Sequence, residues 1–162
     1  MNRSQLKNLT LAAIALICLS LMTGCGGAKD DVERVHAVLD LFEVGIEQGS
    51  AGIIRGLMSE AGLAEGSVTQ RFRTSGIGLN GSDPGAFIAA MAEQNANIVQ
   101  MTRSRTVTIV GDAASAAQQY DFSASYLLDT PVQNYQNTGS EEFSLVKENG
   151  DWKISFWRDT TQ

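Results

Sequence analysis

The spacing of hydrophobic residues changes its period along the chain, and each period predicts a different kind of element. Apolar side chains recur every three or four positions between Asp30 and Gly49, which predicts an amphipathic helix with acids at its start and a glycine at its end. Ser50 can cap a second helix that reaches residue 61, and Asp83 followed by Pro84 predicts the start of a third. The first part of the chain is therefore expected to be mainly helical, with a short strand at 68–74.

Polar and apolar residues alternate after Asn95, which is the period of a half-buried strand. The pattern predicts four strands, at 98–110, 113–128, within 132–147 and at 152–158. Short turns separate them, and Asn149-Gly150 is the strongest hairpin signal in the chain. Successive strands with short turns form an antiparallel meander, and the three helices need one face of it to bury their apolar sides. The fold class is therefore predicted as α+β.

The first 24 residues show the three zones of an export signal. Residues 1–8 carry Arg3 and Lys7 and no acid, residues 9–22 carry no charge, and Thr23 and Gly24 are small. A helix over the 14 residues of the apolar run would be about 21 Å long, short of the roughly 30 Å hydrocarbon core of a bilayer. A signal segment is therefore favoured over a permanent transmembrane helix.

Residues 21–25, LMTGC, resemble the lipobox of bacterial lipoproteins. The resemblance implies cleavage before Cys25, transfer of a diacylglyceryl group to its thiol and acylation of the new N-terminus. Residues 1–24 would then be the signal peptide, 25–29 a lipidated tether and 30–162 the folded domain. Gly26 stands where aspartate would favour the inner membrane, so the resemblance implies an outer-membrane anchor facing the periplasm in a Gram-negative cell. An ordinary signal peptide with a chance cysteine, or an uncleaved anchor, is the alternative.

Composition limits the class of protein and its partners. A chain of 162 residues, 43% apolar and 19% charged, fits one globular domain. Its formal charge is −6, and loss of Arg3 and Lys7 with a signal peptide would make it −8. This acidic balance argues against nucleic acid as a partner. Cys18 and Cys25 both lie near the start, so we expect no disulfide in the fold.

The end of the chain resembles the closing hairpin of the NTF2-like (SnoaL-like, cystatin-related) superfamily. Residues 143–158, FSLVKENGDWKISFWR, show its apolar strand, its polar turn with glycine, and its Trp-Lys-Ile followed by a further aromatic residue. The resemblance covers residues 30–158 and implies N-terminal helices packed in a strongly curved antiparallel sheet, a cone with a cavity at its wide end. Another α+β sandwich of similar topology is the main rival.

The strand at 113–128 supplies the candidate pocket residues. Its even positions carry Gln118, Tyr120 and Tyr126 among small and apolar side chains. If this face is concave, the phenols and the amide offer hydrogen bonds to a small apolar or amphipathic ligand. The alternative is that both tyrosines are core aromatics whose hydroxyls reach solvent.

The last strand supplies a candidate interface residue. Trp152, Ile154 and Phe156 share one face and are expected in the core, so Trp157 is expected on the other face. An exposed tryptophan there would favour a homodimer or contact with an envelope protein, and local packing is the alternative.

Acid–base catalysis has few candidate residues. Some proteins of the resembling superfamily are isomerases, dehydratases or cyclases, which need a pocket carboxylate or histidine. His36 is the only histidine, and Asp40 lies one helical turn away on the same side. The pair is a weak candidate for a general base, and a boundary position on an amphipathic helix is the alternative.

Other motifs carry less weight. Residues 76–81 spell G-x-G-x-x-G, but a dinucleotide site needs a parallel βαβ unit rather than a meander. One histidine and no grouped carboxylates leave a metal site unsupported, and no cofactor is expected. Arg71 and Arg73 should share one strand face, as should Arg103 and Arg105. These arginines could pair with neighbouring acids or meet an anionic head group or glycan.

Together these features predict a membrane-tethered cell-envelope lipoprotein whose NTF2-like domain binds a small ligand or an envelope protein without catalysis. One alternative is an acid–base enzyme that uses the cone pocket. Another is a structural subunit of an envelope assembly, as related folds are in secretion machinery. The sequence names neither the ligand nor the oligomeric state.

Overall fold

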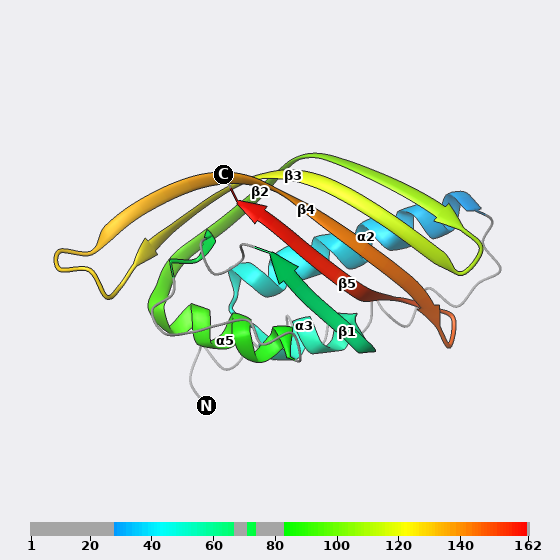
Figure 1. Ribbon diagram of the computed structural model, residues 1–162, viewed down its shortest axis with the longest axis horizontal. Helices are drawn as coiled ribbons and strands as arrows, with labels where there is room; N and C mark the ends of the chain where they lie inside the picture. The colour runs from blue at the N-terminus through cyan, green and yellow to red at the C-terminus, as the bar shows by residue number, and fades with distance from the viewer. Residues whose placement is uncertain (1–27, 67–70, 74–82, 162) are drawn as a thin grey trace, which may run out of the picture.

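The computed structural model describes residues 28–66, 71–73 and 83–161, and the predicted signal peptide, Cys25 and the 76–81 motif lie outside them. Helices and strands follow one another in the order α2 (Ala28–Glu47), α3 (Ala51–Leu57), β1 (Met58–Gly66), α5 (Pro84–Gln94), β2 (Asn95–Val110), β3 (Ala113–Tyr126), β4 (Gln133–Glu148) and β5 (Asp151–Thr161). Figure 1 shows the sheet arching over the helices, which lie together on its concave side.

The helices begin where the capping residues predict. The Ser50 hydroxyl accepts a hydrogen bond from the Ile53 amide at 3.4 Å, and the Asp83 carboxylate accepts one from Ala86 at 2.9 Å. Gly49 has a φ of +60°, which a glycine adopts without strain at the end of a helix. None of the described helices is long and apolar enough to cross a bilayer.

The sheet contains the predicted antiparallel meander and one strand more. Its order is β1-β5-β4-β3-β2; β2 to β5 pair antiparallel, and β1 pairs parallel with β5. The residues of β1, MSEAGLAEG, lack the alternation that predicted the other strands, and the second helix ends at Leu57 instead of reaching residue 61. The predicted α+β class is confirmed, and the curved sheet remains unclosed.

A β-bulge decides which aromatic residues of β5 enter the core. Ser144 pairs with Phe156 while the next residue, Leu145, pairs with Ile154, so Ser155 is an extra residue that resets the alternation. Trp157 is consequently 0% exposed and packs edge-on against the Phe42 ring at 4.9 Å. The expectation that Trp157 faces outward, and with it an interface at this residue, is wrong.

Candidate functional site

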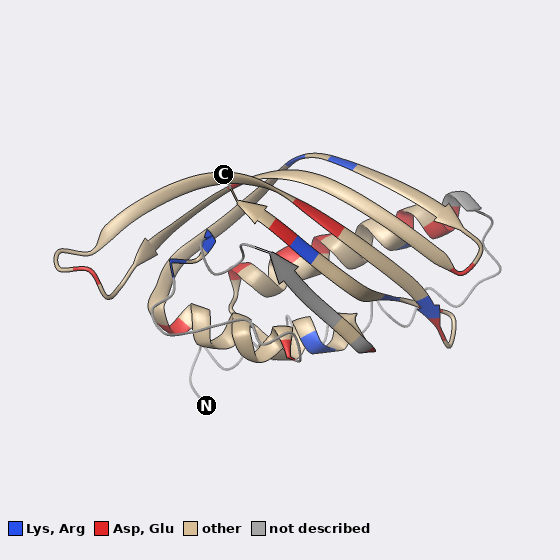
Figure 2. Ribbon diagram, viewed as in Figure 1, with Lys and Arg blue, Asp and Glu red and all other residues tan. Residues whose placement is uncertain are grey.

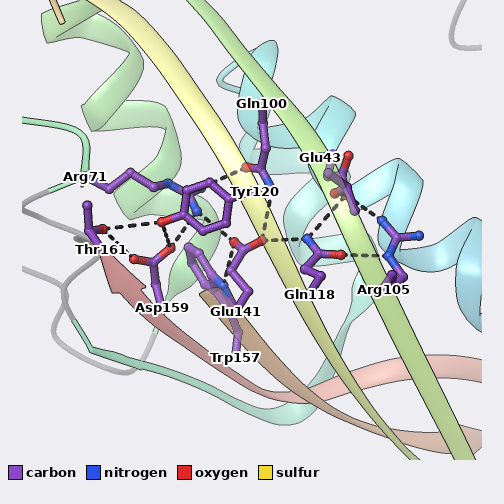
Figure 3. A network of polar contacts seen from close by, with 11 residues as sticks. Glu43, Arg71, Gln100, Arg105, Gln118, Tyr120, Glu141, Trp157, Asp159 and Thr161 are labelled. Carbon is purple, nitrogen blue, oxygen red and sulfur yellow. Dashed lines mark hydrogen bonds and ion pairs between the residues drawn. The ribbon is translucent and has the colours of Figure 1, made fainter. Parts of the chain in front are cut away.

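A buried polar cluster lies between the sheet and the helices, at the concave face. Arg71 is at its centre and is 0% exposed, as are Glu141 and Asp159. Arg71 Nη1 donates to Glu141 Oε1 at 2.8 Å and to Asp159 Oδ2 at 2.6 Å, and Nη2 donates to Gln100 Oε1 at 3.1 Å (Figure 3). We call Arg71 and its surrounding side chains the Arg71 site, which comprises Gln100, Gln118, Tyr120, Glu141, Trp157, Asp159 and Thr161.

Glu141 is the most heavily contacted acid of the site. Its Oε1 accepts from Arg71 and from Trp157 Nε1 at 3.1 Å, and its Oε2 accepts from Gln100 Nε2 at 2.9 Å and Gln118 Nε2 at 2.6 Å. Four donors on two oxygens suit a group that can only accept hydrogen bonds, which is an ionised carboxylate.

The two glutamines link this carboxylate to arginines. The Gln100 oxygen accepts from Arg71 while its amide nitrogen donates to Glu141, and the Gln118 oxygen accepts from Arg105 Nε at 2.7 Å while its nitrogen donates to the same Glu141. Arg105 also binds Glu43 of α2. The chain of contacts therefore runs from the buried centre to the side where α2 packs on β2 (Figure 3).

Asp159 lies in a different electrostatic setting. The Tyr120 hydroxyl donates to its Oδ2 at 3.0 Å, and the Thr161 hydroxyl donates to its Oδ1 at 2.8 Å. Burial raises the pKa of Asp159 above its ordinary value, with the Glu141 charge adding to the rise and Arg71 opposing it. Burial likewise raises the pKa of Tyr120 to about 12, so the phenol keeps its proton and donates.

The Arg71 guanidinium is also surrounded by aromatic rings. Its central carbon lies 4.4 Å from the Phe72 ring centre, 4.7 Å from that of Tyr120 and 5.1 Å from that of Phe122. Burial by itself lowers the pKa of this guanidinium, but Glu141 and Asp159 more than compensate and raise it. Two carboxylates and several ring faces together form a setting for a buried planar cation.

Two of the three predicted pocket residues belong to the Arg71 site, and the third lies outside it. Gln118 and Tyr120 share a face, as predicted, and this face is the inward one; their polar atoms bond to side chains of the Arg71 site. Tyr126 lies outside the site, where the Arg73 guanidinium is 5.1 Å from its ring centre. Whether any of the three binds a ligand stays a prediction.

The candidate acid–base pair lies at the α2–β2 side of the network. Asp40 is exposed and accepts from Arg105 Nη1 at 2.6 Å, while the same nitrogen is 3.5 Å from His36 Nδ1. Arg105 thus bridges the two side chains, and they lie beyond Gln118 rather than among the buried carboxylates.

Two predictions about the arginines are wrong. Residues 71–73 form no strand; Arg71 is buried, whereas Arg73 is exposed and pairs with Asp129 at 3.2 Å. In β2 a register shift between Thr102 and Ser104 adds a residue, so the side chain of Arg103 is 57% exposed while that of Arg105 is 7% exposed.

Sequence reasoning missed the central residues of the Arg71 site. Glu141 alternates with Phe143 and Leu145, and this shared parity could have placed it on the inward face of β4. Asp159 follows Trp157 by two positions, but the bulge at Ser155 hid that face. Nothing in the pattern around Arg71 indicates burial.

The outer face of the sheet has a shallow depression of about 290 Å³. Thr106 and Thr108 of β2, Glu142 of β4 and Phe156 of β5 are among its lining residues. Arg158 pairs with Glu142 at 3.3 Å and lies over the Phe156 ring, so charged and aromatic groups meet at this edge. In Figure 2 most of the described sheet ribbon is tan, and an acidic and a basic position adjoin on β5. Among the described residues, no group of three or more His, Cys, Asp or Glu is arranged to hold a metal ion.

Comparison with known proteins relates the chain to a fold. No protein-family model matches it, and no curated protein matches it. An NTF2-like superfamily protein from Salmonella enterica matches its structure with a TM-score of 0.63 and 15% identity, over 78% of this chain and 87% of that one. The Kfla4162 protein from Kribbella flavida has a TM-score of 0.69 and 14% identity, over 84% and 93%. A protein with a cystatin-like fold from Caulobacter vibrioides has a TM-score of 0.63 and 11% identity, over 81% and 89%. The architecture and these similarities together show that the chain has the NTF2-like fold.

Proposed function

We propose that the protein is a lipid-anchored module of the cell envelope whose NTF2-like domain binds a small ligand or a partner protein without catalysing a reaction. The observation that carries the non-catalytic role is the saturation of Glu141, whose oxygens accept four internal hydrogen bonds. A general base must have an oxygen or nitrogen within reach of a substrate proton. The Glu141 oxygens are instead committed to holding a cation and three neutral donors.

The anchor rests on residues 21–25, which resemble a lipobox. Two or more acyl chains hold a protein stably on a bilayer, where one chain is marginal. The few residues between Cys25 and the start of α2 at Ala28 would keep the domain within roughly 15 Å of the membrane surface. In a Gram-negative cell, Gly26 favours the outer membrane and the periplasmic side.

Metabolic labelling tests the anchor. We expect labelled palmitate to tag the wild-type protein and the Cys18→Ala variant, and to leave Cys25→Ala untagged. Cys18 is the matched control because it is the other cysteine of the chain and lies in the proposed signal peptide. Equal labelling of Cys25→Ala, or no labelling of the wild type, would refute lipidation at Cys25.

Thermal denaturation and crosslinking test the binding role. A screen of envelope metabolites and lipids should find one class that raises the melting temperature, because a ligand that binds only the folded state stabilises it. For the partner version, a photo-crosslinker at Thr108, in the outer depression, should capture an envelope protein in cells, whereas one at Arg34 beside the β4–β5 turn should not. No thermal shift and no specific adduct would refute both versions.

One observation favours an acid–base enzyme as the second candidate. Asp159 has a pKa raised by burial and accepts from the Tyr120 phenol at 3.0 Å, which is a pairing of carboxyl and phenol that enolising enzymes use. This candidate requires a substrate whose turnover is lost in Asp159→Asn and kept in Asp121→Asn, an exposed acid on the outer face of the same sheet. Equal turnover by the two variants would exclude it.

A further inference from the structure

Most side chains that surround Arg71 belong to strands of the sheet, whereas Arg71 itself does not. Gln100 lies on β2, Tyr120 and Phe122 on β3, Glu141 on β4, and Trp157 and Asp159 on β5. Arg71 belongs to the connection between β1 and α5. Four strands therefore build a receptor-like surface, and a side chain from the β1–α5 connection fills it (Figure 3).

Strand pairing fixes the two carboxylates next to each other. Glu141 and Asp159 are direct partners in the β4–β5 ladder, and Gln118 is the direct partner of Glu141 in the β3–β4 ladder. Like charges opposite each other on neighbouring strands repel, and burial strengthens the repulsion. The sheet by itself thus creates a buried site that favours a cation, whichever molecule supplies it.

We propose that this site binds a guanidinium or amidinium group of a small ligand, and that Arg71 is a tethered competitor for the same position. The inference rests on the proposed ligand-binding function and names the ligand class. It differs from an ordinary buried ion pair in requiring that Arg71 can be replaced by a molecule from solution.

The chemistry of the walls selects a planar cation. The carboxylates of Glu141 and Asp159 and the Gln100 carbonyl all accept from the Arg71 fork, which has its donors in one plane. The rings of Tyr120 and Phe122, both on β3, lie 4.7 and 5.1 Å from its central carbon. A neutral group of the same shape would leave the two carboxylates without a counter-charge.

Two features leave room for exchange. Glu141 and Asp159 both pair with the Nη1 nitrogen of Arg71, at 2.8 and 2.6 Å, so the two carboxylates compete for one nitrogen of the guanidinium. The Arg71 Nε is buried and has no hydrogen-bond partner in the part of the chain that the structure describes. A free ligand is not limited by the Arg71 backbone and can orient all of its donors.

Calorimetric titration of the full-length protein in detergent tests the proposal. The probe is methylguanidinium chloride at millimolar concentration, with urea as the neutral planar control and sodium chloride as the ionic control. Removing a competitor raises the fraction of open sites and so the apparent affinity. We expect the wild type to bind methylguanidinium weakly and Arg71→Ala to bind it at least tenfold more tightly. Urea should bind to neither protein.

Arg73→Ala is the matched control, because Arg73 is two residues away, exposed and paired with Asp129 outside the site. It should bind methylguanidinium as the wild type does. If Arg71→Ala folds only when methylguanidinium is present, that rescue supports the proposal. If Arg71→Ala does not fold under either condition, the Arg71→Lys variant takes its place in the titration. The lysine side chain has a shorter, non-planar cation that competes less well for the site, so Arg71→Lys should bind methylguanidinium more tightly than the wild type does.

Three results would overturn the proposal. Arg71→Ala, or Arg71→Lys in its place, could bind no more tightly than the wild type. The wild type could show no binding up to tens of millimolar while Arg71→Ala binds, which would make Arg71 a permanent structural group. The ligand screen could find only uncharged or anionic ligands, which would support the proposed ligand-binding function and refute the guanidinium inference. A screen that finds no ligand would refute both the ligand-binding function and the guanidinium inference.

Discussion

Replacing Glu141 by glutamine tests whether the buried cluster holds the fold together. Glu141→Gln keeps the size of the side chain and removes one of the two carboxylates that face Arg71, at 2.8 and 2.6 Å. It also puts an amide nitrogen where an oxygen now accepts two hydrogen bonds, so at least one neighbouring donor is left unpaired. Trp157 Nε1 and the Gln118 amide are the donors at risk.

The expected loss of unfolding free energy follows from these contacts. Breaking a buried ion pair by removing one partner costs about 3–5 kcal/mol. Asp159 still compensates Arg71, which places the charge contribution near the lower end. A stranded buried donor adds about 1–3 kcal/mol. We therefore expect a loss of about 4 kcal/mol, which is a large share of the ~5–15 kcal/mol stability of a typical domain.

Urea unfolding with linear extrapolation measures this loss, and the neighbouring residue supplies the control. Glu142 points to the outer face, its side chain is 62% exposed, and it pairs with Arg158 at 3.3 Å. Because exposed ion pairs contribute little, Glu142→Gln should change the stability by less than about 1 kcal/mol. A loss for Glu141→Gln no greater than for Glu142→Gln would refute the structural role assigned to the cluster.

Two further predictions concern packing and pH. A Cβ at Gly139 would lie 2.3 Å from the Tyr120 hydroxyl, so the Gly139→Ala variant should lose about 1–3 kcal/mol of unfolding free energy, measured with urea. Gly52 lies in open space on α3, so the control variant Gly52→Ala should lose no stability or gain up to about 1 kcal/mol. Equal effects of the two substitutions would refute the reasoning. Burial raises the pKa of Asp159 in the folded state, so its contribution to stability is present below 3.8 and is lost as the pH rises through the folded value. The free energy of unfolding should therefore fall more steeply between pH 4 and pH 7 for the wild type than for Asp159→Asn. The same pH dependence in both proteins would contradict the raised pKa.

Local patterns predicted the elements whose stability is local. The three- and four-residue spacing predicted α2, and side-chain caps at Ser50 and Asp83 placed the starts of α3 and α5. Alternation and short turns predicted β2 to β5 within a few residues. β1 escaped because a parallel strand at the edge of the sheet depends on β5, about ninety residues away, rather than on its own alternation.

The candidate site was harder to predict because single extra residues invert faces. The bulge at Ser155 moved Trp157 into the core, and the register shift after Thr102 separated Arg103 from Arg105. Neither bulge has a glycine or proline to mark it in the sequence. Gln118 and Tyr120 lie on one face, as the alternation predicted, because β3 pairs with β4 without interruption.

The composition of the Arg71 site itself argues for more than stability. Replacing a buried ion cluster by apolar side chains of similar volume is often neutral or stabilising, because such a change removes the desolvation of several charges. Phe72, Phe122 and Trp157 already pack around the Arg71 guanidinium, so an apolar replacement for Arg71, Glu141 and Asp159 would extend an existing core. A fold that needed only a filled interior would be served by that simpler solution. Packing alone therefore does not require a charged centre, and the cation-binding proposal predicts that the Arg71 site is the part of the molecule where ligand binding should first be sought.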